Sequence, residues 1–206
     1  MTVEPIILVG SGGHARACID IIEQQGHFSI VGLVGIPHEV GTSVLGYPVL
    51  GTDADLPGLR QKSPNALVTV GHIKTPAPRI RLFESLAKMG FCLPTILSPR
   101  AYVSRHASVG KGTIVMHGAL VNAAASVGHN CILNTHAVVE HDVVIADHCH
   151  VSTTTVINSG AQVGAGTFIG SNSSLRELVK VGKNCLIGMG QRVLSDVEDG
   201  SRILNR

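Results

Sequence analysis

An aliphatic residue recurs at every sixth position of this chain, without a miss, from Leu97 to Val193. An α-helix repeats apolar residues roughly every 3.6 positions and one long strand repeats them every second position, so neither accounts for this spacing. A small side chain precedes most of these residues by two positions, as Ala137 precedes Val139, and residues two apart share one face of a strand. The register is kept by Leu97, Val103, Val109, Val115, Val121, Val127, Leu133, Val139, Ile145, Val151, Ile157, Val163, Ile169, Leu175, Val181, Ile187 and Val193.

Turn-forming residues separate these short strands. Gly110-Lys111-Gly112 and Gly164-Ala165-Gly166 are examples, and glycine tolerates the positive φ that a tight corner requires. Short strands joined by regular corners coil into a solenoid, and the period resembles that of the left-handed parallel β-helix built from hexapeptide repeats. Three hexads make one triangular coil in that fold. A sandwich of short strands is the alternative, and the even spacing disfavours it.

The composition excludes several classes of function. The net charge is only +2 and no basic run is present, so nothing indicates a nucleic-acid partner. The sequence has neither an apolar run of about 18 residues nor a basic segment before an apolar N-terminal stretch, which predicts a cytoplasmic protein without a membrane partner. Of the five cysteines, Cys131, Cys149 and Cys185 occupy inward positions of the repeat, so we expect buried small side chains rather than nucleophiles.

The N-terminal third of the chain has a different pattern. Strand-like runs cover 5–9, 30–34 and 66–70, and helical spacing covers 17–25, 53–61 and 78–89. Strands that alternate with helices predict a small Rossmann-like parallel α/β unit. We therefore expect a nucleotide-sugar-binding domain over residues 1–93 and a β-helix domain over residues 94–206.

A glycine-rich turn, Gly10-Ser11-Gly12-Gly13-His14-Ala15, follows the first strand and fits the pattern G-x-G-x-x-A. A dinucleotide site also needs an acidic residue at the end of the second strand, where this chain reads Val34-Gly35-Ile36, so NAD is disfavoured. The N–H groups at the start of the following helix favour a phosphate-bearing substrate. A tight turn without a ligand remains the alternative.

Histidines gather in the middle of the repeat. The register places His117, His129, His136 and His148 on corners, where solvated side chains are the expected state, and it places His150 on an outward strand position. His141 differs from the other histidines because Glu140 and Asp142 flank it. A carboxylate on one ring nitrogen fixes the tautomer and raises the basicity of the other nitrogen, so His141 is the candidate general base.

The positions of His141 and His150 also bear on assembly. They lie nine residues apart, half a coil around, so two packed copies would bring them together more easily than one chain. This predicts a site between subunits of a cyclic oligomer, with a homotrimer as the preferred assembly.

Zinc is the rival interpretation of the histidines. The spacing of His136 and His141 also occurs in zinc carbonic anhydrases built on this solenoid. A third histidine is missing at the expected place, where Arg100 and Arg105 stand and only His106 is near, so no metal is expected.

Taken together, the sequence resembles the hexapeptide-repeat sugar N- and O-acetyltransferases of bacterial surface-glycan pathways, in particular the branch that acts on GDP-linked perosamine. The resemblance spans nearly the whole chain. Its segments are Ile7-Leu8-Val9-Gly10-Ser11-Gly12-Gly13-His14, Gly46-Tyr47-Pro48-Val49-Leu50-Gly51, Leu133-Asn134-Thr135, Glu140-His141-Asp142 and His150-Val151-Ser152.

The resemblance implies acetyl-CoA as co-substrate, without a metal, and a nucleotide sugar as acceptor. His141 is then the base and Asp142 orients it. The remaining implied contacts are Gly12, Gly13 and His14 at the sugar-phosphate end, Asn134 and Glu140 in the sugar pocket, and His150, Ser159, Gly170 and Gly188 on the cofactor, Ser159 through its backbone N–H.

The resulting hypothesis is direct transfer of the acetyl group from acetyl-CoA to a sugar amine, with no covalent intermediate because no activated serine or cysteine pair is evident. The alternatives are O-acetylation of a sugar hydroxyl, a zinc-dependent hydratase and a non-catalytic scaffold. Gly35-Ile36 replaces the acidic pair that contacts the base in relatives acting on UDP-sugars, which disfavours uridine and leaves guanosine open. The Pro-Gly-x-Pro-Ala ending of relatives is also missing, so its cofactor contacts are unassigned.

Overall fold

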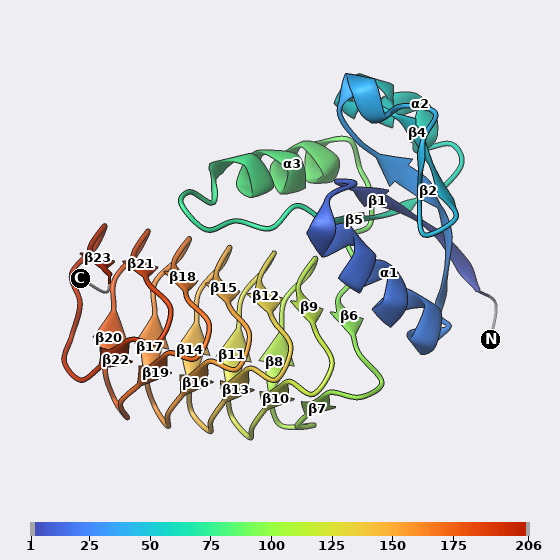
Figure 1. Ribbon diagram of the computed structural model, residues 1–206. Helices are drawn as coiled ribbons and strands as arrows, with labels where there is room; N and C mark the ends of the chain where they lie inside the picture. Colours follow the sequence, from blue (N-terminus) through green and yellow to red (C-terminus); the bar gives the residue numbers. More distant parts are fainter. Residues whose placement is uncertain (1–2, 205–206) are drawn as a thin grey trace.

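The computed structural model describes residues 3–204 as an α/β unit followed by a coil of short strands (Figure 1). In the α/β unit β2, β1 and β5 pair in parallel, β4 joins β2 in parallel, and β3 pairs antiparallel at the edge, in the order β3-β4-β2-β1-β5. The strands are β1 (Glu4–Val9), β2 (Phe28–Val34), β3 (Ser43–Val44), β4 (Tyr47–Gly51) and β5 (Asn65–Val68). The helices are α1 (Gly13–Gln25), η1 (Pro37–Glu39), η2 (Asp53–Asp55), α2 (Leu56–Leu59) and α3 (Ala77–Lys88).

Alternate side chains of β1 build two cores. Ile6 and Leu8 pack with α1, while Ile7 and Val9 pack on the opposite side with α2 and α3. This confirms the parallel α/β unit expected from the sequence. The helix expected over 53–61 is divided into η2 and α2, in keeping with Pro57 and Gly58, which are poor helix formers.

The coil consists of two-residue strands that stack in three parallel sheets, here called faces 1, 2 and 3. Face 1 holds β6 (Ile96–Leu97), β9 (Ile114–Val115), β12 (Ile132–Leu133), β15 (His150–Val151), β18 (Phe168–Ile169), β21 (Leu186–Ile187) and β23 (Arg202–Ile203). Face 2 holds β7 (Tyr102–Val103), β10 (Leu120–Val121), β13 (Val138–Val139), β16 (Val156–Ile157), β19 (Ser174–Leu175) and β22 (Arg192–Val193). Face 3 holds β8 (Ser108–Val109), β11 (Ser126–Val127), β14 (Val144–Ile145), β17 (Gln162–Val163) and β20 (Lys180–Val181).

The second residue of each strand through β22 is the aliphatic residue of the hexad. These residues and the small side chains two positions earlier form one continuous core through the coil. Several corners use a left-handed backbone, as at Asn130, His136 and Asp142, whose φ values are 54°, 57° and 61°. The left-handed β-helix expected from the repeat is confirmed. The register ends after Val193, since the next strand begins only at Arg202.

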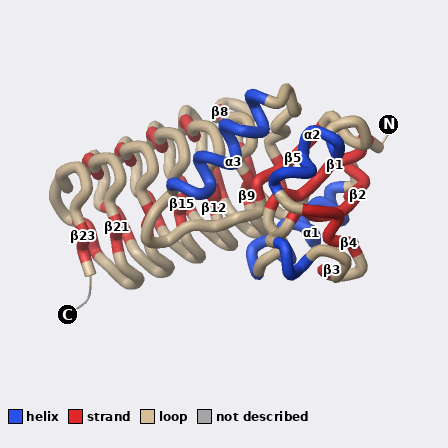
Figure 2. Tube along the Cα trace, turned by 90° about the horizontal axis from the view of Figure 1, so that it is seen from above, coloured by secondary structure: helices blue, strands red, loops and turns tan. Residues whose placement is uncertain are grey.

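The outward residues of face 1 explain where the α/β unit sits. Ile96, Ile114 and Ile132 are fully buried and pack with α1 in one core. Farther along the same column, His150 and Phe168 are also buried, next to His72 of the segment that leads into α3. Helix α3 runs along the coil itself (Figures 1 and 2). The chain's own N-terminal unit therefore covers face 1 from β6 to β18.

Arg79 of α3 joins the two parts of the molecule. Its side chain is fully buried, its Nη1 donates to the carbonyl oxygens of Val68 and Val70 at 2.7 and 2.8 Å, and its Nε donates to Asn130 O at 3.1 Å. Burial lowers the pKa of this guanidinium to about 10. The hydrogen bonds tie the end of β5 to a corner between faces 3 and 1.

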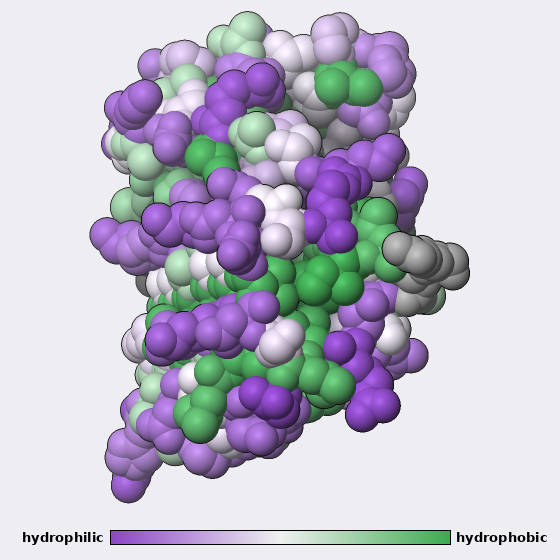
Figure 3. Space-filling view, turned by 90° about the vertical axis from the view of Figure 1, so that its left-hand side faces the viewer, coloured by the Kyte–Doolittle hydropathy of each residue, from purple (hydrophilic) through white to green (hydrophobic). Residues whose placement is uncertain are grey.

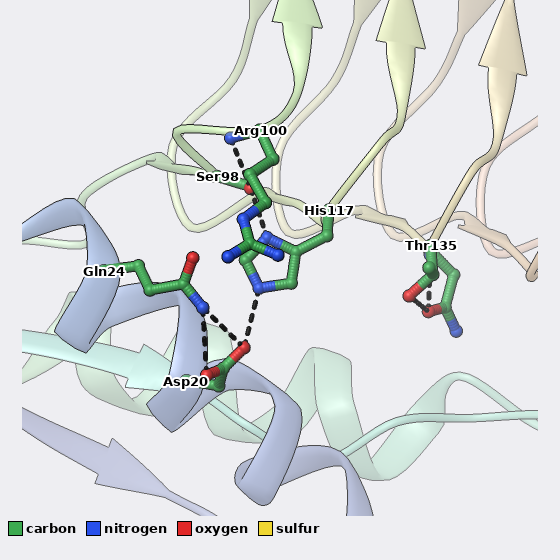
Figure 4. A network of polar contacts seen from close by, with 7 residues as sticks. Asp20, Gln24, Ser98, Arg100, His117 and Thr135 are labelled. Carbon is green, nitrogen blue, oxygen red and sulfur yellow. Dashed lines mark hydrogen bonds and ion pairs between the residues drawn. The ribbon is translucent and has the colours of Figure 1, made fainter.

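A second link involves His117, on the edge between faces 1 and 2. Its Nε2 lies 2.7 Å from Asp20 of α1 and its Nδ1 lies 2.6 Å from Ser98 Oγ (Figure 4). The expectation that His117 is simply solvated is wrong, as it is for His148, which is half-buried against Phe83 and bonded to Asn130. Both rings contact the N-terminal unit, and the repeat alone does not predict where that unit packs against the coil.

The C-terminal end of the coil is partly apolar. Figure 3 faces this end and shows hydrophobic side chains gathered between hydrophilic ones. Met189, Leu194 and Leu204 are exposed there. Within residues 3–204, no helix has the length and apolar character needed to cross a membrane.

Candidate functional site

A pocket of about 400 Å³ opens at the carboxyl ends of β1, β2 and β5. The glycine-rich turn lines it with Ser11, Gly12, Gly13 and His14, and Arg81 of α3 stands on the other side. No side chain caps the N-terminus of α1, and a Cβ added at Gly12 or Gly13 would meet open space. The pocket therefore presents the first N–H groups of α1 to an anion, as the sequence predicts.

An acidic side chain that the sequence argument overlooked enters this pocket. Glu39 of η1 accepts hydrogen bonds from Ser11 Oγ at 2.6 Å and from Ile36 N at 3.0 Å, and these bonds lower the pKa of its carboxyl. A Cβ at Gly35 would lie only 2.7 Å from this carboxylate. The pocket thus contains an acidic side chain, although Glu39 lies five residues beyond the end of β2 rather than at its end.

His14, Asn134 and His150 converge where the α/β unit meets face 1, a region we call the junction. Asn134 Nδ2 lies 3.4 Å from His150 Nε2, and His150 Nδ1 donates to the carbonyl of His72 at 2.8 Å. Burial, with a smaller contribution from nearby Arg79, lowers the pKa of His14 to about 3 and that of His150 to about 4. His150 points away from the coil core, as predicted, and is nevertheless buried because the chain around His72 covers it.

His141 occupies a different environment, on the edge between faces 2 and 3. Its Nδ1 lies 2.7 Å from the Asp142 carboxylate, and Ser159 Oγ donates to its Nε2 at 2.8 Å. The left-handed φ of Asp142, which aspartate tolerates, belongs to the corner. In a neutral imidazole whose Nδ1–H bonds to the carboxylate, Nε2 is the nitrogen that accepts hydrogen bonds or a proton. The side chains of His141 and Asp142 are 55% and 65% exposed, so the base is open to a ligand.

The predicted site residues thus fall into separate groups. Glu140 lies beside His141 and bonds to Asn122 at 2.9 Å, on the edge between faces 2 and 3. Gly170 and Gly188 lie on the edge between faces 1 and 2. There a Cβ at Gly170 would stand 2.5 Å from the Gly188 backbone, so close stacking of coils explains that glycine. The edge that carries His141 lies opposite face 1. One chain therefore does not bring His141 together with the junction residues or with the pocket at the glycine-rich turn.

The zinc interpretation finds no support in the geometry. His136 lies on the edge between faces 1 and 2, whereas His141 lies on the edge between faces 2 and 3. Across residues 3–204, no group of three or more histidine, cysteine or acidic side chains is arranged to hold a metal.

Residues 5–86 match the family described as the PglD N-terminal domain. The whole chain is similar to PerB from Caulobacter crescentus, solved with CoA and GDP-perosamine, at 29% identity and a TM-score of 0.92 over 99% of this chain and 95% of that one. It is also similar to the acetyltransferase domain of PglB from Neisseria gonorrhoeae, solved with acetyl coenzyme A, at 27% identity and a TM-score of 0.90 over 99% and 97%.

WeeI from Acinetobacter baumannii, at 19% identity, a TM-score of 0.66 and coverage of 98% and 97%, shares the fold. No curated protein sequence matches the chain. These similarities confirm the fold and the resemblance to the bacterial sugar acetyltransferases that the sequence indicates.

Proposed function

We propose that this chain is an acetyl-CoA-dependent N-acetyltransferase whose acceptor is the amino group of a nucleotide-linked amino sugar, with GDP-perosamine as the first candidate. The observation that carries the proposal is the similarity along almost the entire chain to an enzyme solved with CoA and GDP-perosamine. The pocket at the glycine-rich turn and the base-competent His141 supply the two chemical functions that such a reaction needs.

The two parts of the chain divide the work in this proposal. Residues 1–93 hold the nucleotide sugar, its phosphates at Gly12, Gly13 and His14 and its base toward Glu39. Residues 94–206 hold acetyl-CoA along the coil, with His150, Ser159, Gly170 and Gly188 as the expected contacts. The cofactor-bound PglB domain supports a β-helix as the carrier of acetyl-CoA.

In the chemical step, the sugar amine attacks the thioester carbon and His141 Nε2 takes the amine proton. Asp142 stabilises the imidazolium that forms, and the Ser159 N–H stabilises the oxyanion. CoA leaves as the thiol. PerB holds CoA and GDP-perosamine at the same time, which favours direct transfer within one complex.

We further propose that the working form is a homotrimer with sites between copies. The chain's own N-terminal unit covers face 1, while His141 lies on the opposite edge, so the pocket of one copy needs the edge of another. Face 2 carries an apolar outward stripe suited to this contact: Tyr102 is 60% exposed, and Leu120, Val138 and Val156 are partly exposed. A cytoplasmic location suits the use of acetyl-CoA.

The proposal is tested by thiol release from acetyl-CoA in the presence of GDP-, UDP- and dTDP-linked amino sugars, each paired with its hydroxy analogue. Thiol release well above the rate with acetyl-CoA alone, in the presence of an amino sugar, and an N-acetyl product by mass spectrometry are the expected result. Stimulated release with the hydroxy analogues alone, and an O-acetyl product, would replace the proposal by O-acetylation. No release with any acceptor would leave a binding module.

A further inference from the structure

The hydroxyl of Ser159 has no role in the transfer just described, yet it is bound to the base. Ser159 Oγ lies 2.8 Å from His141 Nε2, and Asp142 lies 2.7 Å from the other ring nitrogen. A hydroxyl bonded to an imidazole, which a carboxylate orients in turn, is the arrangement that activates serine nucleophiles. Ser159 and His141 belong to successive coils and lie 18 residues apart, so the pair is not evident from local sequence motifs.

The backbone holds this arrangement in register. Gly160 N donates to His141 O at 3.0 Å, so the corner that carries Ser159 is hydrogen-bonded to the corner that carries the base. The backbone N–H of Ser159 has no acceptor within residues 3–204. The N–H of a nucleophilic serine can itself stabilise the oxyanion that forms during its own acylation. Nucleophile, base, orienting acid and oxyanion donor thus stand together at this edge.

We propose that Ser159, His141 and Asp142 form a nucleophilic triad that hydrolyses acetyl-CoA when no amine acceptor occupies the site. This inference rests on the proposed function, because it requires acetyl-CoA to bind at this edge. It adds an acceptor-independent thioesterase activity with an acetyl-serine intermediate.

The hydrolysis proceeds in two steps, acylation of Ser159 and deacylation by water. Ser159 Oγ attacks the thioester carbon while its proton passes to His141 Nε2; the C–S bond breaks, and the sulfur takes that proton to leave as CoA thiol. Water then attacks the acetyl ester and gives a proton to His141. The Ser159 oxygen leaves with this proton, and acetic acid departs and ionises. A bound sugar amine competes with Ser159 for the same thioester carbon and the same base.

The experiment incubates the full-length protein with acetyl-CoA alone, quenches samples in acid, and maps acetyl groups by peptide mass spectrometry. Thiol release at saturating acetyl-CoA is followed in parallel. Ser159→Ala is the test variant. Ser126→Ala is the matched control because Ser126 lies outward on face 3 and its hydroxyl bonds, among residues 3–204, only to Ser108 Oγ. His141→Asn removes the base without removing the hydroxyl.

The expected result is one acetyl group on Ser159 in the unaltered protein and in Ser126→Ala, and none in the other two variants. Acceptor-independent thiol release should fall at least about tenfold in Ser159→Ala and in His141→Asn. A protein that acetylates an amino sugar but carries no acetyl group on Ser159 would overturn this inference alone. A protein that transfers acetyl to no acceptor would overturn the proposed function instead.

Discussion

The junction and the edge that carries His141 both hold histidines, but in opposite surroundings. At the junction, burial holds the pKa values of His14 and His72 to about 3 and that of His150 to about 4, beside the buried cation Arg79. At the edge, His141 is open and polar groups occupy both of its ring nitrogens. Burial thus favours uncharged rings at the junction, whereas the exposed edge leaves His141 accessible to a substrate.

The largest effect should come from His141→Asn. Loss of the general base should lower kcat for acetyl transfer by about 10²- to 10⁴-fold with the fold intact. His136→Asn is the matched control, since that ring is exposed on another edge and should leave kcat within about twofold of the unaltered protein. Steady-state thiol release and circular dichroism measure both points. Near-normal turnover of His141→Asn would show that the exposed histidine on this edge is not the general base.

Arg79→Met should produce the largest loss of stability. The change leaves the buried carbonyls of Val68, Val70 and Asn130 without their guanidinium donor, which should lower the free energy of unfolding by on the order of 3 kcal/mol. Arg81→Met, two positions along α3 and exposed, should change it by less than about 0.5 kcal/mol. Urea denaturation compares the free energies of unfolding of the two variants. Equal losses would show that the hydrogen bonds of Arg79 between the two parts of the chain add no stability.

The stability of the whole protein should fall in mild acid because of the junction. The unfolded chain binds protons on His14, His72 and His150 with a pKa near 6.5, whereas the folded chain binds them only near pH 3 to 4. The unfolded state therefore holds more protons below about pH 6.5, and stability present at pH 7 is lost as pH decreases toward 4. Urea midpoints measured from pH 7.5 to 4.5 should fall steadily, and a flat series would contradict the buried junction.

His72→Leu should have the smallest effect at neutral pH and still be informative. Both ring nitrogens of His72 are buried and have no hydrogen-bond partner among the residues that the structure describes. An apolar side chain should therefore maintain the free energy of unfolding at pH 7 or raise it by up to about 1 kcal/mol. The same variant should weaken the acid dependence by roughly 1 kcal/mol per pH unit. A clear loss of stability at pH 7 would show that the ring makes a needed polar contact.

The sequence predicts the coil well because each hexad contacts only its neighbours, so a one-dimensional repeat carries the architecture. His141 and Asp142 can be proposed as a pair from the sequence because they are adjacent in the chain. Ser159 follows His141 by one full coil, and the same spacing separates Ile96, Ile114 and Ile132. Comparing residues one coil apart therefore could have indicated both the proposed triad and the face on which the N-terminal unit packs.

Other features depend on how the two parts of the chain meet. Arg79, His72 and Glu39 become significant only once α3, the segment before it and η1 are placed against the coil or the glycine-rich turn. No local periodicity in the N-terminal third encodes that placement. The same reason explains why His117 and His148 were expected to be solvated.

Subunit complementation shows whether the pocket of one copy works with His141 of another copy. Gly13→Glu should block the pocket, since a side chain there enters open space and its charge repels phosphate. His141→Asn removes the base. Neither variant alone should transfer acetyl to the amino sugar, but their co-expression at equal levels should restore about one quarter of normal activity, because that share of sites combines two intact halves. Co-expressed chains that remain inactive although they assemble together would place the whole site within one chain and contradict the account.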